Sequence, residues 1–155
     1  MRKITKESAK AFVNFKSYKK DNTEVSFGWT PKRNDETNYA FKEKETACLF
    51  LHGNNIAEIT RLSDSKETTS INLDLCGWRT PTTRERINGV LDALGYDFRI
   101  AQRKGEQVLI RCMGLKPVDD ILKLSDDSFD PNFAQRVFNS SEFVSGTDLN
   151  AITDF

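Results

Sequence analysis

The stretch from Thr68 to Gly95 constrains the fold most, because it carries the signals of a strand, a corner and a complete helix. Apolar and polar residues alternate from Ile71 to Leu75, which is the two-residue period of a strand with one buried face and one exposed face. Gly77-Trp78 ends that strand and turns the chain. A strand followed so closely by a helix indicates a fold that mixes both kinds of element.

The helix after this corner has both a start signal and a stop signal. Thr82 and Glu85 have the spacing of a capping box, in which each side chain accepts a hydrogen bond from a backbone N–H at the helix start. Gly95 stands where a left-handed residue commonly ends a helix. We therefore predict a helix from about Thr83 to Leu94, with a buried stripe at helical spacing that comprises Ile87, Val90, Leu91 and Leu94.

The first part of the chain, residues 1–116, is predicted to form one α+β domain. A helix capped by Thr5 opens it, and strands follow, separated by a long loop within 28–46 and by a turn at His52-Gly53-Asn54-Asn55. A last hairpin turns at Lys104-Gly105. The predicted architecture is an antiparallel meandering sheet, with the N-terminal helix and one central helix packed on one face.

Residues 117–155 are predicted to form an acidic, partly helical C-terminal extension. The segment 118–124 is expected to make one or two helical turns, and Asp130-Pro131 is a start signal for a further helix. Its aromatic content is too high for a purely solvated tail. We expect the extension to dock, either on the domain itself or on a partner, through Phe129, Phe133, Phe138 and Phe143.

The charge is distributed unevenly although the whole chain is formally neutral. Residues 1–20 contain seven Lys or Arg and one Glu, a net charge of +6, whereas residues 118–155 carry a net charge of −6. Such an asymmetry suggests contact with a polyanion at one end, and masking or mimicry of a polyanion at the other.

Composition also bounds the compartment. No apolar run is long enough to span a bilayer, and the first residues lack the apolar segment of a secretory signal, so no membrane partner is expected. The cysteines are three in number and widely spaced, which favours a reducing compartment over a disulfide framework. We expect a cytoplasmic protein.

Three groups of residues together resemble a family of small uncharacterised proteins encoded by tailed bacteriophages. They are Leu51-His52-Gly53-Asn54 with Ile56-Ala57, then Gly77-Trp78, then Thr82-Thr83-Arg84-Glu85-Arg86-Ile87-Asn88. The resemblance covers roughly residues 4 to 112, and the acidic segment after Pro117 departs from the family pattern. It implies a phage origin, the bacterial host cytoplasm as the compartment, and a role in host takeover, counter-defence or nucleic-acid housekeeping.

The chain offers few groups for catalysis, so we expect no enzyme, no cofactor and no metal. His52 is the only histidine, and it falls in a predicted turn with no carboxylate or cysteine that the sequence aligns with it. Together with His52, the thiols of Cys48, Cys76 and Cys112 could furnish four zinc ligands, but the paired spacing typical of zinc sites is missing. No phosphate-binding loop or dinucleotide fingerprint is present.

Nucleic-acid binding, to DNA or RNA, is the function that the residue types favour. Basic side chains on the first helix and at the start of the central helix would contact phosphates, and Trp78 beside Arg79 would stack on an unpaired base. The predicted contact residues are Lys6, Lys10, Trp78, Arg79, Thr83, Arg84 and Arg86.

Two other interpretations remain open at this stage. Trp78 at a strand end is often a core residue, and scattered lysines are often only a solvated face. Alternatively, the protein inhibits a host protein through the acidic C-terminal segment, whose four phenylalanines would be anchors rimmed by negative charge.

Overall fold

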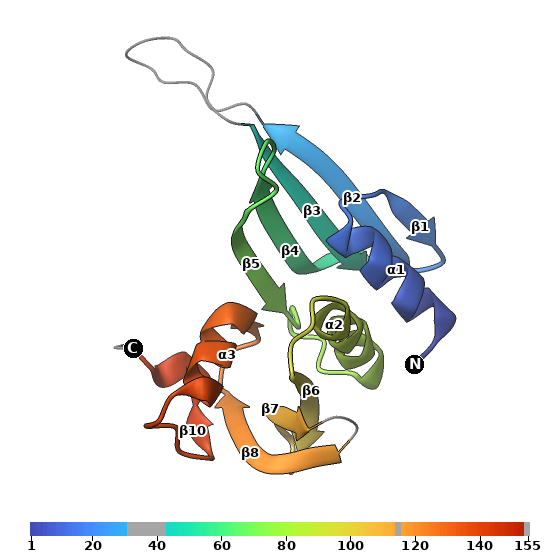
Figure 1. Cartoon of the computed structure of the whole chain (residues 1–155). Coiled ribbons are helices and arrows are strands. Elements are labelled where there is room, and N and C mark those ends of the chain that lie inside the picture. Colours follow the sequence, from blue (N-terminus) through green and yellow to red (C-terminus); the bar gives the residue numbers. More distant parts are fainter. Residues whose placement is uncertain (31–42, 114–115, 154–155) are drawn as a thin grey trace.

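The computed structural model describes residues 1–30, 43–113 and 116–153, and these residues form helices and two β-sheets. The first sheet has six strands in the order β1-β2-β3-β4-β5-β9, and the second has four in the order β10-β8-β7-β6. All neighbouring strands are antiparallel except β10 and β8, which are parallel. The α+β class is confirmed (Figure 1).

The elements follow one another along the chain in an order that alternates between the two sheets near the C-terminus. They are α1 (Lys3–Val13), β1 (Tyr18–Lys20), β2 (Thr23–Thr30), β3 (Lys44–Leu51), β4 (Asn54–Leu62), β5 (Thr68–Asp74), α2 (Pro81–Ala93), β6 (Phe98–Arg103), β7 (Glu106–Met113), β8 (Lys116–Leu124), β9 (Ser128–Phe129), α3 (Pro131–Asn139), β10 (Thr147–Asp148) and the 3-10 turn η1 (Leu149–Ala151).

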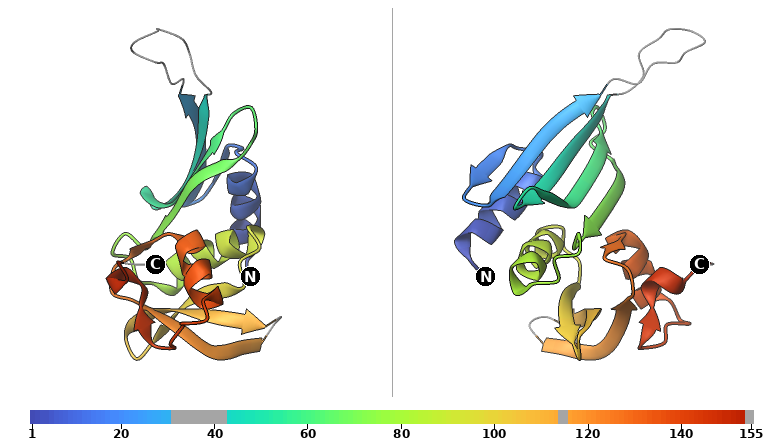
Figure 2. Two further views of the ribbon diagram at one scale, coloured as in Figure 1. Left: turned by 60° about the vertical axis from the view of Figure 1, so that its left-hand side comes forward. Right: turned by 180° about the vertical axis from the view of Figure 1, so that it is seen from behind.

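The meander runs from β2 to β5, and the helices lie against its lower part. Figure 2 shows α1 along one face of the first sheet, with α2 below it, between the two sheets. The two helices approach closely at Gly89, where an added Cβ would lie 2.6 Å from Cγ2 of Thr5. The hairpin of β6 and β7 does not extend the meander but belongs to the second sheet.

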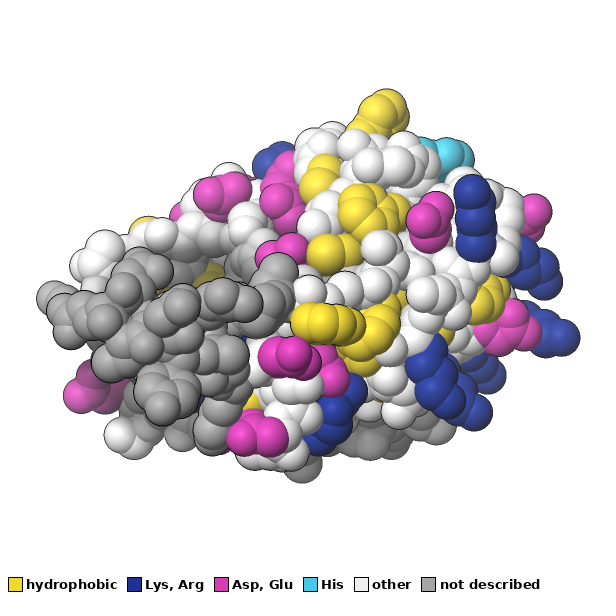
Figure 3. Space-filling model, turned by 90° about the horizontal axis from the view of Figure 1, so that it is seen from above, with side chains coloured by type: hydrophobic (Ala, Val, Ile, Leu, Met, Phe, Trp, Pro, Cys, Tyr) yellow, Lys and Arg dark blue, Asp and Glu magenta, His cyan; other side chains and the backbone are white. Residues whose placement is uncertain are grey.

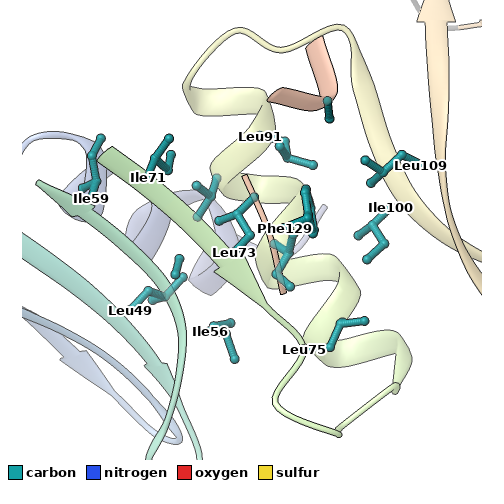
Figure 4. Packing of buried hydrophobic residues seen from close by; sticks show 14 of the residues in the cluster. Leu49, Ile56, Ile59, Ile71, Leu73, Leu75, Leu91, Ile100, Leu109 and Phe129 are labelled. Carbon is teal, nitrogen blue, oxygen red and sulfur yellow. The ribbon is translucent and has the colours of Figure 1, made fainter. Parts of the chain in front are cut away.

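One hydrophobic core joins both sheets and the helices. It contains Leu49 and Leu73 from the first sheet, Leu91 from α2, and Leu109 from the second sheet, all at most 1% exposed. Figure 4 shows these side chains meeting around α2. The position of α2 is therefore fixed by apolar contacts on two sides.

Both predicted helix starts are displaced, for a physical reason in each case. Helix α2 is capped by Thr80, whose hydroxyl accepts the N–H of Thr83, because Pro81 occupies the first helical position. Thr82 is therefore not the cap. Helix α1 begins at Lys3, so Thr5 lies inside it, fully buried, and does not cap it.

Turns that need a left-handed backbone are where the sequence predicts them. Gly95 has φ +82° and follows the end of α2. His52 and Gly53 have φ +51° and +80° and join β3 to β4, as a tight hairpin turn requires. Of the predicted loop within 28–46, the flanks belong to β2 and β3, and residues 31–42 lie outside the described residues.

The acidic C-terminal segment is part of both sheets. Residues 118–124, expected to be helical, lie in strand β8, where Leu122 pairs with Leu109. The predicted helix after Asp130-Pro131 is confirmed as α3, with the Asp130 side chain accepting the N–H of Asn132. Strand β9 adds to β5. Of the two predicted docking modes for this segment, contact with the chain's own domain is observed. The predicted boundary between two domains at residue 116 stays a prediction.

None of the described helices is long and apolar enough to cross a bilayer.

Candidate nucleic-acid interface

The first surface to consider is formed by α1 and β1, which carry the basic N-terminal residues. Lys6 and Lys10 are exposed on α1, as the sequence predicts. Figure 3 shows Lys and Arg side chains concentrated toward the right-hand side of this view, the side on which α1 and β1 lie in Figure 1. We call Lys6, Lys10, Lys16 and Lys20, all of which are exposed, the basic N-terminal surface.

The lysines of this surface have uncompensated charges. Three other basic residues of the same segment form ion pairs, in which Arg2 meets Glu85, Lys3 meets Glu7, and Lys19 meets Glu24. Lys6, Lys10, Lys16 and Lys20 make no ion pair with any residue that the structure describes.

A basic hollow adjoins the start of α1. It measures about 450 Å³, and Met1, Arg84 and Arg99 are among the residues that line it. The Nη1 atom of Arg84 donates to the carbonyl of Arg79 at 3.0 Å and to the side-chain oxygens of Gln102 and Gln107 at 3.1 and 3.3 Å. All three acceptors are neutral, so within the described part of the chain they orient the Arg84 guanidinium without cancelling its charge.

Arg86, which is also a predicted contact residue, lies in the interior. It is 2% exposed, and its guanidinium donates to the hydroxyls of Thr5 and Thr23 and to the carboxylate of Glu85. Burial lowers the pKa of Arg86, and the hydrogen bond from Thr5 holds the pKa of Glu85 below its usual value. Arg86 therefore ties α1, α2 and β2 together and cannot reach a nucleic acid.

Thr83 is also buried, at 1% exposure, and its hydroxyl lies 3.0 Å from that of Thr80. It fits the helix start into the core. Thr83 and Arg86 were both expected at an exposed contact surface. Burial rules this out for Arg86, and it leaves Thr83 only as part of the wall of the pocket that Trp78 lines. A signal for this was present, since Thr83, Arg86, Ile87 and Val90 share one helical stripe.

Arg79 and Trp78 lie at the corner between β5 and α2, which Asp127 holds in place. One Asp127 oxygen accepts the Nε–H of Arg79 at 2.8 Å, and the other accepts the N–H of Gly77 at 2.7 Å. Arg79 is exposed but has its charge compensated. Trp78 is 57% exposed, so it is not the core residue that one interpretation of the sequence suggested.

The structure therefore separates residues that the sequence groups into one corner. Pro81, Arg84 and Glu85 line the basic hollow, while Thr82 and Trp78 line a different pocket. What the structure does bring together is the start of α1 and the Arg84 side of α2, through Met1 and the Arg2–Glu85 pair.

The phenylalanines of the C-terminal segment belong to this chain's own core. Phe129 and Phe138 are 4% and 2% exposed, and Phe133 and Phe143 are partly buried against the same cluster. The ring of Phe138 lies 5.4 Å from that of Phe98 on β6. They were expected as partner-binding anchors, but their burial leaves Phe129 and Phe138 no exposed apolar surface to offer a partner.

The thiols and the histidine do not assemble into a metal site. No group of three or more His, Cys, Asp or Glu side chains is arranged to hold a metal ion in the described ranges. Burial, aided by the neighbouring Glu58 carboxylate, raises the pKa of the Cys48 thiol to about 11. Burial also raises the pKa of Cys76. Both thiols are protonated at neutral pH, which makes them poor nucleophiles.

The opposite charges of the two ends do not neutralise each other. Asp127 pairs with Arg79, Asp120 pairs with Arg111, and Asp130 caps α3. Among described residues, no ion pair joins 1–20 to 118–153, and Figure 1 shows the two termini on opposite sides of the molecule. The basic N-terminal surface therefore faces solvent with its charge intact.

Comparison with known proteins places the chain in a family. The Kyanoviridae Gp96 protein family matches residues 1–150. The match confirms the resemblance to bacteriophage proteins, and it includes most of the acidic segment that we expected to depart from the family pattern. No curated protein and no solved structure matches the chain.

Proposed function

Because the chain belongs to the Kyanoviridae Gp96 protein family, a family of bacteriophage proteins, we propose that it binds nucleic acid in the cytoplasm of the infected host. The proposed activity is binding without catalysis, in the service of host takeover or counter-defence. The contact surface is the basic N-terminal surface together with Arg84 and Arg99 in the adjoining hollow.

The observation that carries this proposal is the uncompensated charge of Lys6, Lys10, Lys16 and Lys20. Exposed lysines that already have carboxylate partners would exchange one ion pair for another on binding a phosphate. Lysines without such partners gain a new contact and release the counterions condensed on the nucleic acid. The absence of ion pairs within the described residues therefore supports a polyanionic partner.

The basic hollow gives the same surface a second feature. Arg84 lies in the first turn of α2, where the helix dipole adds positive potential. Its three hydrogen bonds all use Nη1, which leaves Nη2 and Nε without a hydrogen-bond partner among the described residues. A fixed guanidinium with two such nitrogens suits a phosphate oxygen, which accepts hydrogen bonds from arginine.

Salt dependence of binding is the direct test. The full chain is titrated with fluorescently labelled single-stranded DNA, duplex DNA and single-stranded RNA at several salt concentrations, and affinity is measured by fluorescence anisotropy. Affinity should fall linearly on logarithmic axes as salt rises. Replacing Lys6 and Lys10 together by glutamine should reduce the slope by about 1 to 2, since each phosphate contact contributes about 0.7 to 0.9.

A matched control removes the same number of charges elsewhere. Lys104→Gln with Arg136→Gln changes two exposed basic residues, one in the turn between β6 and β7 and one on α3. This control should keep the wild-type slope. If no ligand binds at low salt, the proposal is wrong, and if both double variants lose equal slope, the contact surface is wrong.

A further inference from the structure

A small pocket lies between the β3–β4 turn and the corner that carries Trp78. Its volume is about 290 Å³, near the lower end of the range for ligand pockets. The residues that line it come from the end of β3, from the turn, from β4, from the corner and from the first turn of α2. They are Leu51, His52, Asn54, Ile56, Trp78, Thr80, Thr82 and Thr83.

A left-handed backbone turn places Trp78 in its exposed position. The two residues before it, Cys76 and Gly77, have φ +55° and +78°. A left-handed non-glycine residue is costly, and such strain persists where the surrounding structure enforces it, often at functional sites. Asp127 enforces it here through the N–H of Gly77, and the Cys76 N–H donates to Asp74 at 2.8 Å.

The opposite wall of the pocket is held just as firmly. His52 is itself left-handed, at φ +51°, and its ring nitrogen Nε2 lies 3.1 Å from the side-chain nitrogen Nδ2 of Asn22. A bond from the Cys76 thiol to the carbonyl of Asn55, at 3.1 Å, connects the corner to β4. Both walls are thus positioned before any ligand arrives, which reduces the entropic cost of binding.

The chemistry of the lining specifies the ligand. Leu51 and Ile56 are buried and form an apolar base, while the indole of Trp78 provides a flat wall. His52, Asn54, Thr80 and Thr82 contribute hydrogen-bonding groups, and no Asp, Glu, Lys or Arg from the described part of the chain lines the pocket. A charged group would find no counter-charge here. The lining suits a neutral, flat ligand with apolar faces and a polar edge.

We propose that this pocket binds one unpaired nucleobase of a single strand, stacked on Trp78. The inference rests on the proposed function, which it narrows to single-stranded nucleic acid, because a base in a duplex cannot enter. Base stacking on an aromatic side chain is worth about tenfold or more in affinity.

DNA strands with and without bases distinguish binding in the pocket from binding to the basic N-terminal surface. The full chain is titrated with an oligothymidylate and with an abasic strand of equal length, which has the same phosphates. The wild type should bind oligothymidylate about tenfold or more tightly than the abasic strand. Trp78→Ala should abolish this difference and leave both the affinity for the abasic strand and its salt slope unchanged.

Trp29 provides a matched control, because it is 56% exposed and stands on β2, outside the pocket. Trp29→Ala should keep the preference for bases. If the wild type bound both DNA strands equally well, the proposal that the pocket binds a nucleobase would be wrong, and the proposed phosphate binding would stand. Loss of the preference in Trp29→Ala but not in Trp78→Ala would also contradict nucleobase binding in the pocket.

Free thymidine tests the pocket without any phosphate. Its binding should quench the fluorescence of Trp78 in a Trp29→Phe variant, in which Trp78 is the remaining tryptophan. If neither strand binds but thymidine still quenches, the proposed function fails and the pocket stands. Nucleobase binding in the pocket is ruled out if millimolar thymidine does not quench the fluorescence and the two DNA strands bind equally or not at all.

Discussion

Replacing Arg86 by alanine should destabilise the protein while leaving phosphate binding unchanged. The guanidinium is 2% exposed and donates to the hydroxyls of Thr5 at 2.6 Å and Thr23 at 3.2 Å, and to the Glu85 carboxylate at 3.1 Å. These partners belong to α1, β2 and α2. Removing the side chain therefore disconnects three elements and removes one hydrogen-bond donor from each of the three acceptors.

The magnitude follows from the bonds that are lost. A hydrogen bond contributes about 1 kcal/mol net, and more when one partner is charged. Three bonds give a loss of about 3 kcal/mol, to which the vacated volume adds and from which the relieved desolvation of the guanidinium subtracts. In a chain of this size, about 3 kcal/mol lowers Tm by roughly 6 to 12 °C.

Thermal and urea unfolding followed by circular dichroism measure this loss, with Arg84→Ala as the comparison. Arg84 is partly exposed and its acceptors are neutral, so Arg84→Ala should cost about 1 kcal/mol or less and should reduce affinity for DNA. Arg86→Lys keeps a charge and should be intermediate in stability. Wild-type stability in Arg86→Ala, combined with weaker DNA binding, would refute the assignment of Arg86 to the core.

Three further substitutions test the packing and the charges. Gly89→Ala should destabilise the chain by about 1 to 3 kcal/mol in urea, despite the better helix propensity of alanine, because its Cβ would lie 2.6 Å from Thr5; a gain in stability would show that α1 can shift. Burial would raise the pKa of Glu45, but hydrogen bonds from Arg61 and Lys66 outweigh burial and lower it. The ionised Glu45 therefore contributes its full share to folding stability above the unfolded pKa near 4.5, and this share is lost as pH falls through the lower pKa of the folded state. Glu45→Gln should accordingly cost more stability at pH 7 than at pH 3, and an equal cost at both would contradict the ion pair. The Cys48 thiol, with a pKa of about 11, should react slowly with iodoacetamide at pH 7.5, and Glu58→Gln should accelerate the reaction; fast alkylation of the wild type would count against the raised pKa.

Elements whose ends depend on local backbone conformation could be predicted from the sequence. Gly95 ends α2 in the left-handed region, and the turn at His52-Gly53 has the positive φ angles that a two-residue hairpin needs. These features depend on a few neighbouring residues. The start of α2 is harder, since Thr80 and Thr82 are equally good caps by type, and Pro81 decides between them.

Pairings between distant strands could not be predicted. The alternation of Leu122 and Leu124 is too short to distinguish a strand from a helical turn, and β8 forms because β7 offers an unpaired edge beside it. The second sheet depends on this pairing. A single-sheet meander was therefore the simplest arrangement consistent with local patterns, but it was incomplete.

The candidate site shows the same division. Helical spacing was enough to place Lys6 and Lys10 on an exposed face. Arg84 and Arg86 are the same residue type two positions apart, and only the packing of one side of α2 against Thr5 distinguishes them. The role of Asp127 was not predicted, because it contacts Gly77 and Arg79 from a segment 50 and 48 residues away. Contacts of that range are set by tertiary structure alone.

The salt dependence of DNA binding, compared between the wild type and Lys6→Gln with Lys10→Gln, tests the central claim most directly. We expect wild-type affinity to drop steeply between low and physiological salt, and the double variant to drop less steeply. Identical slopes in the two proteins, or no measurable affinity in either at low salt, would show that the uncompensated lysines of α1 do not serve to hold a polyanion.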